Sequence, residues 1–195
     1  MSETAEQIYE RAMAAADADG RLPMPPVEDW DTFPFEGDLR VRPLLPPADE
    51  PPRLGEGGRD DCWRCQRGDA GALWRDERWR VVSRDEPFGL PVVVILETRE
   101  HMDLPDLPDD LAADFGRLVV RIERAVRAVG NIGRVHVGRW GDGGAHFHAW
   151  FMGRPARLPQ LRTSFAAIWD DILPPTPQDV WRANLETVAR ALAAA

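Results

Sequence analysis

The chain of 195 residues has a hydrophobic fraction of 44% and a formal net charge of −9. This length fits one domain with appendages or at most two small domains, with enough apolar residues for a packed core. No apolar run approaches the roughly 18–20 residues that span a bilayer, and the N-terminus lacks the basic-then-apolar pattern of a secretion signal. The acidic balance argues against broad nucleic-acid binding, which depends on cationic contacts to phosphates. We therefore expect a cytoplasmic protein with no membrane partner and no broad nucleic-acid binding.

The charge is unevenly distributed along the chain. Residues 1–60 contain six arginines and fourteen acidic residues, a local net charge of −8. Residues 121–162 contain eight arginines against Glu123 and Asp142, a local net charge of +6. Lysine is absent. Codon bias in a GC-rich genome explains this most simply, but it leaves guanidinium groups, which suit bidentate phosphate contacts, around the second region.

An acidic, proline-rich arm is predicted over residues 1–59. Residues 21–58 are rich in proline and glycine, which precludes long regular elements. The same stretch contains large apolar residues such as Trp30, Phe33 and Phe35, which a disordered tail rarely has.

The body of the chain, residues 60–156, predicts an α+β fold. Residues 109–129 place apolar side chains at helical spacing between Pro108 and Gly130. The order of the predicted elements, β-β-β-α-β-β, indicates an antiparallel sheet with a helix on one face. A C-terminal helical extension, residues 157–195, follows. The predicted strands cover residues 72–75, 78–83, 91–97, 133–140 and 146–152, and the C-terminal helices cover 161–173 and 178–194.

The most informative stretch begins at His146, because it places two of the four histidines two residues apart. On a strand, alternate side chains share a face, so His146, His148 and Trp150 face one way. The apolar residues between them then face the core. Two neighbouring imidazoles can share a task or divide it, one holding a metal while the other attacks a substrate. The alternative is a pair of incidental histidines in a buried strand.

Cys62 and Cys65 form the chain's single C-x-x-C. In a cytosolic protein this spacing indicates metal binding or redox chemistry before a disulfide. A redox pair is expected at the start of a helix after a strand, whereas these cysteines follow a proline- and glycine-rich linker. A tetrahedral zinc site needs two further ligands. The remaining soft donors are His101, His136, His146 and His148. The alternatives are reduced cysteines without metal and, for His101, an ordinary loop histidine.

Taken together, these motifs resemble the histidine triad (HIT) superfamily, in its zinc-containing branch and with a variant motif, His-Phe-His-Ala-Trp. The resemblance runs from about Asp60 to Pro155 and includes the order of elements. The C-x-x-C precedes a hairpin, a buried strand, a histidine, a long helix, a glycine-rich turn and the H-x-H segment. It implies a HIT-like antiparallel sheet with a long helix, carrying a proline-rich N-terminal arm and C-terminal helices. A homodimer is expected by analogy alone.

The resemblance also implies which residues bind the metal. In zinc-containing members, including the related galactose-1-phosphate uridylyltransferases, the ligands match Cys62, Cys65, His101 and His146 of this sequence. This closed Cys2His2 set leaves no open coordination position, so the zinc is expected to be structural.

The family's nucleophile matches His148. The chemistry that this implies is attack of a neutral imidazole on the α-phosphorus of a nucleotide, giving a nucleotidyl-histidine that water or a second acceptor resolves. Donors for the phosphoryl oxygens are expected from the backbone of the glycine turn, including Gly143 and Gly144, and from Arg139. His136 is a second catalytic candidate.

Two departures from the family pattern bear on activity. Trp150 occupies the third triad position, where most hydrolase members have histidine, and an indole donates one hydrogen bond but accepts no proton. The transferase branch also lacks that histidine. The usual polar segment before the motif is missing as well, because Gly143 and Gly144 lead almost directly into His146. His136, on the preceding strand, can partly compensate, and Trp150 can stack on a base or simply fill the pocket.

The leading functional hypothesis is therefore a nucleotide-phosphate hydrolase or nucleotidyltransferase acting through His148 on a nucleotide or nucleotidyl small molecule. The alternative is a zinc-stabilised HIT-like nucleotide-binding or scaffold protein without turnover.

Overall fold

The computed structural model describes residues 10, 12–23, 33–35 and 37–194, and the chain divides into two units, residues 1–51 and 52–195. In the first unit, residues 10 and 12–14 are helical, and the other described residues form no helix or strand. Much of the predicted arm, at residues 1–9, 11, 24–32 and 36, lies outside the described residues. The domain boundaries predicted at residues 59 and 156 stay predictions.

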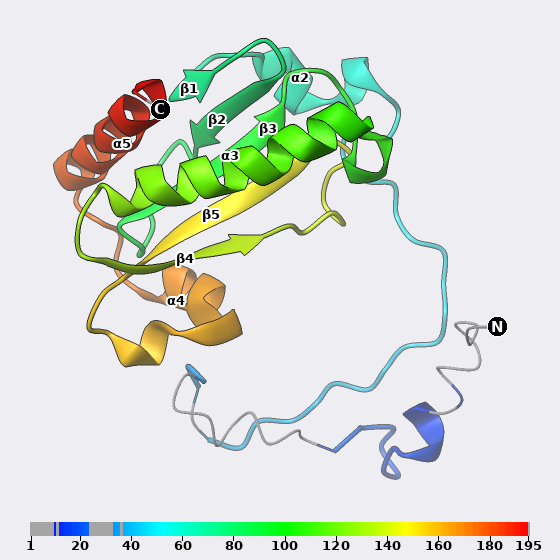
Figure 1. Ribbon diagram of the computed structural model, residues 1–195. Helices are drawn as coiled ribbons and strands as arrows, with labels where there is room; N and C mark the ends of the chain where they lie inside the picture. Colours follow the sequence, from blue (N-terminus) through cyan, green and yellow to red (C-terminus); the bar gives the residue numbers. More distant parts are fainter. Residues whose placement is uncertain (1–9, 11, 24–32, 36, 195) are drawn as a thin grey trace. The chain divides into compact units, whose positions relative to one another are not determined.

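The second unit is built on one antiparallel sheet (Figure 1). Within the described residues its five strands are ordered β1-β2-β3-β5-β4, so the strand that carries the histidines lies inside the sheet and β4 forms an edge. The α+β fold with an antiparallel sheet is therefore confirmed. The strands are β1 (Trp74–Arg75), β2 (Trp79–Ser83), β3 (Val92–Thr98), β4 (Ile132–Gly138) and β5 (His148–Pro155).

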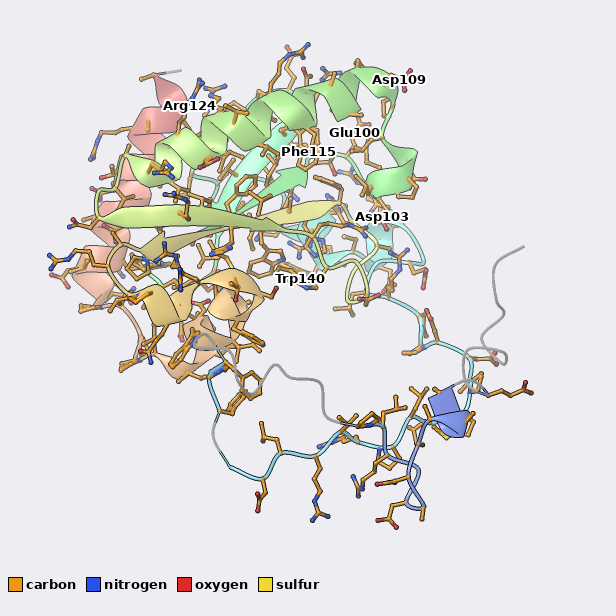
Figure 2. The ribbon with its side chains drawn as sticks, turned by 60° about the horizontal axis from the view of Figure 1, so that its bottom comes forward. Glu100, Asp103, Asp109, Phe115, Arg124 and Trp140 are labelled. Carbon is orange, nitrogen blue, oxygen red and sulfur yellow. The ribbon has the colours of Figure 1, made fainter. Side chains whose placement is uncertain are left out.

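Two helices cover one face of this sheet, α3 (Asp109–Arg127) and α5 (Gln178–Ala193). Their apolar stripes, for example Ile122 on α3 and Val188 on α5, pack into one core with the inward residues of the strands. Phe115 of α3 lies between its helix and the sheet (Figure 2) and stacks on Trp79 at a centroid distance of 6.3 Å. No helix in the described part of the chain is both long and apolar enough to cross a membrane.

A smaller core lies on the opposite face of the sheet. There Val93 and Met152 pack with Leu161 and with α4 (Ala166–Ile172). The predicted helix over residues 161–173 is too long, because residues 159–165 form the 3₁₀ turns η4 (Pro159–Leu161) and η5 (Thr163–Phe165). Thr163 has a φ of 65°, in the left-handed region, so a continuous helix cannot pass through it.

A buried carboxylate ties the cysteine-bearing helix α2 (Trp63–Arg67) to the sheet. Glu97 of β3 has no exposed surface and accepts hydrogen bonds from Arg64 and, at 2.6 Å, from Arg67 of α2. From the neighbouring strand β2, Arg80 donates to the same carboxylate at 2.9 Å and also reaches the backbone carbonyl of Arg64 at 2.9 Å. Three guanidinium groups thus share one acceptor, and this arrangement fixes α2 beside the end of β3.

Replacing Glu97 by glutamine should destabilise the protein by about 3–5 kcal/mol, because it leaves buried guanidinium groups without their counter-charge. Urea unfolding measures the loss. Glu186→Gln is the matched control, since Glu186 makes only an exposed pair with Arg190, and it should stay within about 0.5 kcal/mol of wild type. Equal stabilities for the two variants would show that Glu97 does not anchor α2.

Candidate active site and metal site

The two motif histidines lie where β5 begins. Phe147, Ala149 and Phe151 are fully buried in the main core, which leaves His146 and His148 facing the other side of the sheet. The predicted alternation is therefore correct, but the strand begins at His148 rather than at His146. The reason is that the Phe147 amide donates to the Met102 carbonyl, at 2.7 Å, in the loop that follows β3.

This loop contact brings a third histidine to the cysteines. His101 directly precedes Met102, and its ring centroid lies 5.4 Å from that of His146. Nδ1 of His146 lies 3.4 Å from Sγ of both Cys62 and Cys65, and Nδ1 of His101 lies 3.5 Å from Sγ of Cys65. All four ligand atoms lie within 4.8 Å of one another. The structure thus assembles the four predicted ligands, Cys62, Cys65, His101 and His146, in a cluster that could hold a metal ion.

The spacing of these donors fits a metal ion with tetrahedral coordination. Bond lengths of about 2.3 Å to sulfur and about 2.05 Å to nitrogen place neighbouring S and N ligands about 3.5 Å apart. The three measured S–N distances agree with this value. Gly55 allows the preceding segment to cover the cluster, because a Cβ there would lie 3.0 Å from Cβ of Cys62.

The protonation of the donors also suits a metal. Nε2 of His146 lies 2.8 Å from the Thr98 carbonyl, which can only accept, so Nε2 carries the proton and the lone pair of Nδ1 faces the sulfurs. Burial lowers the pKa of His146 to about 4, so the imidazole is neutral at pH 7. Burial, with Cys62 nearby, raises the pKa of Cys65 to about 11, so binding of a metal at neutral pH displaces the Cys65 proton.

His148 is held in the opposite tautomer. Its Nδ1 donates to the His146 carbonyl at 2.8 Å, which leaves Nε2 with a free lone pair when the ring is neutral. Burial lowers the pKa of His148, and the hydrogen bond to His146 opposes this shift only in part. A Cβ on Gly144 would lie 4.0 Å from Cε1 of His148, so the glycine turn passes close beside the imidazole.

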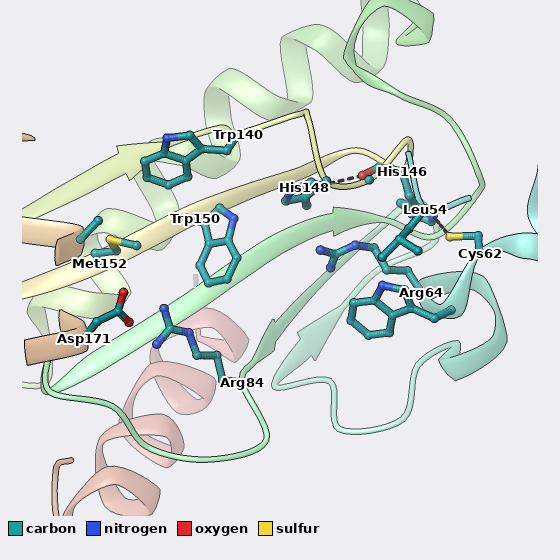
Figure 3. A pocket seen from close by; sticks show the side chains of 14 residues that line it. Leu54, Cys62, Arg64, Arg84, Trp140, His146, His148, Trp150, Met152 and Asp171 are labelled. Carbon is teal, nitrogen blue, oxygen red and sulfur yellow. Dashed lines mark hydrogen bonds between the residues drawn. The ribbon is translucent and has the colours of Figure 1, made fainter. Parts of the chain in front are cut away.

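A cavity of about 430 Å³ opens over His148 (Figure 3). Gly143, Gly144 and Trp150, the residues expected to bind substrate, line this cavity, and their role in substrate binding stays a prediction. Eight further lining residues were missed by sequence reasoning, among them two tryptophans and Arg84. Trp63 and Trp140 complete a set of three indoles, and Arg84 lies with its guanidinium 5.2 Å from the Trp150 ring. Trp63 lies between Cys62 and Cys65, so its place beside the predicted metal ligands could have indicated that it lies near the site. No motif in the local sequence indicates this for Trp140 or Arg84.

Two predicted site residues lie elsewhere. Arg139 forms an ion pair with Asp103, as does Arg53, whose Nη1 lies 2.6 Å from that carboxylate. Arg139 is not among the residues that line the His148 cavity. His136 lines two neighbouring cavities, one of which shares Trp140 with the cavity over His148.

Solved structures similar to this one were found by their folds alone, since no family model and no curated protein matches the sequence. A zinc-bound histidine triad family protein from Mycobacterium smegmatis is 23% identical, with a TM-score of 0.51, over 71% of this chain and 100% of that one. A histidine triad protein from Sinorhizobium meliloti has a TM-score of 0.51 at 12% identity, over 65% of this chain and 92% of that one. A histidine triad protein from Marinobacter aquaeolei has a TM-score of 0.50 at 16% identity, also over 65% of this chain and 92% of that one. The chain therefore has the fold of the histidine triad superfamily.

Proposed function

We propose that this protein is a nucleotide-phosphate hydrolase or nucleotidyltransferase in which His148 is the nucleophile. The observation that carries the proposal is the contact of 2.8 Å between Nδ1 of His148 and the His146 carbonyl, which can only accept a hydrogen bond. The Nδ1 proton of His148 is committed to this carbonyl, so the ring can only attack through Nε2, and the ring lines the cavity. Nε2 bonds to the α-phosphorus, the P–O bond to the leaving group breaks, and the leaving group departs with the electron pair. Water or a second acceptor then attacks the same phosphorus and releases the imidazole.

The glycine turn supplies donors for the transferred group. Gly143 accepts from the Leu54 amide through its carbonyl, which fixes the turn. Within the described residues, the amides of Gly143 and Gly144 donate no hydrogen bond, so both are available to phosphoryl oxygens beside His148. The indoles of Trp63, Trp140 and Trp150 offer faces on which a base can stack.

Trp150 restricts the leaving group. An indole cannot transfer a proton to a departing amine or alkoxide. The reaction therefore favours leaving groups that depart as weakly basic anions and need no proton, such as phosphate or pyrophosphate. His136 stays a prediction as a second catalytic residue, and its place in the neighbouring cavity suits contact with the leaving group better than contact with the attacked phosphorus.

The metal we propose is a structural zinc ion held by Cys62, Cys65, His101 and His146. Four protein donors in a tetrahedral set leave no position for substrate or water. The zinc-bound relative from Mycobacterium smegmatis has the same fold and supports this choice of ion. Bound zinc would fix the loops at both ends of the site, and with them the His146 carbonyl that orients His148.

A nucleotide-binding or scaffold protein without turnover is the second candidate, and Trp150 is the observation that favours it. A tryptophan at this position fills part of the cavity and takes no part in proton transfer. The expected homodimer stays a prediction. The free edge of β4, where Val137 is 45% exposed, is the place where a second copy would extend the sheet.

Incubation with a panel of adenylated and other nucleotidyl substrates, followed by intact-mass measurement, tests the enzyme. Wild type should gain the mass of one nucleoside monophosphate less one water, because Nε2 of His148 forms a covalent bond to phosphorus as the bond to the leaving group breaks. The adduct should be absent from His148→Ala, which should keep the zinc and stability of wild type. An adduct that persists in His148→Ala contradicts the assignment. Measurable nucleotide affinity with neither adduct nor product across the panel would favour the second candidate.

Metal analysis of purified protein tests the zinc site separately. Wild type and His148→Ala should each contain about one zinc per chain. Cys62→Ser, Cys65→Ser and His146→Ala should lose most of it, because each removes one of four ligands. The pair His146→Ala and His148→Ala is informative, since the two residues are neighbours on one face but only the first faces the sulfurs. A folded, metal-free wild type would refute the site.

A further inference from the structure

One of the two cavities that His136 lines has a volume of about 360 Å³ and lies where β4 begins and β5 ends, away from His148. It is lined by four arginines, Arg134, Arg154, Arg157 and Arg162, together with His136. These belong to the arginine-rich region that stands out in the sequence. Between residues 124 and 169 the only acidic residue is Asp142. We call this site the arginine cavity.

In the part of the chain that the structure describes, the four guanidinium groups have no counter-charge. Among the described residues, no carboxylate forms an ion pair with any of them. Several other buried or half-buried arginines are paired, as Arg64 is with Glu97 and Arg99 is with Asp69. Four unpaired cations around one hollow repel one another unless an anion lies between them.

The missing acidic partner matters most for Arg154, because this residue is only 8% exposed and water cannot fully solvate its charge. Its Nη1 donates to the backbone carbonyls of Pro155, at 2.7 Å, and Leu158, at 3.3 Å, so the guanidinium is held in place. Its Nη2 lies 2.6 Å from where a Cβ on Gly133 would stand, so the guanidinium packs directly against this glycine. A buried, fixed guanidinium without a counter-ion is unfavourable, and a bound anion would satisfy it.

His136 adds a polar atom without a partner to the same wall. Its Nε2 is buried and makes no hydrogen bond within the described part of the chain. Burial, and then the charge of Arg154, lower the pKa of His136, so its ring is neutral at pH 7 and can donate one hydrogen bond. Arg157 and Thr163, both on the wall, have φ values of 66° and 65°. Such left-handed conformations are uncommon for residues other than glycine and recur at ligand sites.

We propose that the arginine cavity is a binding site for a phosphate monoester or oligophosphate group. Guanidinium groups bind phosphate oxygens in bidentate pairs, and several of them converge here on one hollow. Arg154 and His148 are six residues apart on β5, about 20 Å at about 3.3 Å per residue. A phosphate bound here is therefore distinct from the one that His148 would attack.

Two sources could supply such a phosphate. A further cavity, lined by His136, Trp140 and Met152 among others, adjoins both the arginine cavity and the cavity over His148. The phosphate can accordingly belong to the far end of a long nucleotidyl substrate lying along β5, or it can be a separate anion. The chemistry of recognition is the same in both cases.

Calorimetric titration of the zinc-loaded protein with inorganic tripolyphosphate, at about 0.15 M salt and with zinc content measured before and after, tests the site. Wild type and His148→Ala should each bind one tripolyphosphate per chain. Arg157→Gln and Arg162→Gln should each weaken binding about tenfold or more, because each removes a charge-assisted hydrogen bond at an exposed position that folding does not need. Arg182→Gln, an equal change of charge on the exposed side of α5, should stay within about twofold of wild type.

Absence of binding at millimolar tripolyphosphate would overturn the proposal. So would an equal loss in Arg182→Gln, which would indicate unspecific attraction, or a loss confined to His148→Ala, which would place the anion at the other cavity. A competition arm then identifies the source. If tripolyphosphate displaces a dinucleoside tetraphosphate but not a nucleoside monophosphate, the site holds the far end of a substrate. If tripolyphosphate and both nucleotides bind together, it holds a separate anion.

Discussion

Phe147 is the residue on which the geometry of the site depends. Its ring is fully buried and meets Phe115 at 5.2 Å and Trp79 at 5.5 Å, edge to face. Its amide bonds the Met102 carbonyl, which brings the loop that carries the third histidine to the start of β5. Because side chains alternate, fixing Phe147 in the core turns both flanking histidines to the opposite face of the sheet. The ligand cluster and the position of the proposed nucleophile are two consequences of this one anchored residue.

Two backbone carbonyls then divide the histidines between two tasks. The Thr98 carbonyl accepts a hydrogen bond from Nε2 of His146, which leaves Nδ1 for the sulfurs. The His146 carbonyl accepts one from Nδ1 of His148, which leaves Nε2 for the cavity. Neither choice needs a charged partner, so both rings can stay neutral, as a metal ligand and a nucleophile must be. A mutation that moved the backbone at His146 would disturb both tasks together.

The sequence predicted those parts of the molecule that depend on local pattern. The alternation around Phe147 and the helix starting at Asp109 follow from spacing, whereas the four-residue ligand set follows from the resemblance to the histidine triad superfamily. Contacts between distant segments were not predictable in this way. Glu97 closes an otherwise apolar run, and only the register of β2 with β3 brings Arg80 to it. The arginine-rich region was visible as a charge excess, but its convergence on one hollow required the pairing of β4 with β5.

The two cavities suggest how one strand could bind a long anionic ligand. The neutral imidazole of His148 lies at the start of β5, and the unpaired guanidinium of Arg154 lies near its end. The central claim, however, concerns the histidine tautomers. Long-range ¹H–¹⁵N NMR correlation of the zinc-loaded protein at pH 7 tests it directly. The account predicts a neutral His148 with its proton on Nδ1, and a His146 with its proton on Nε2 and a metal-shifted Nδ1. A His148 that is charged, or that has its proton on Nε2, would contradict the account.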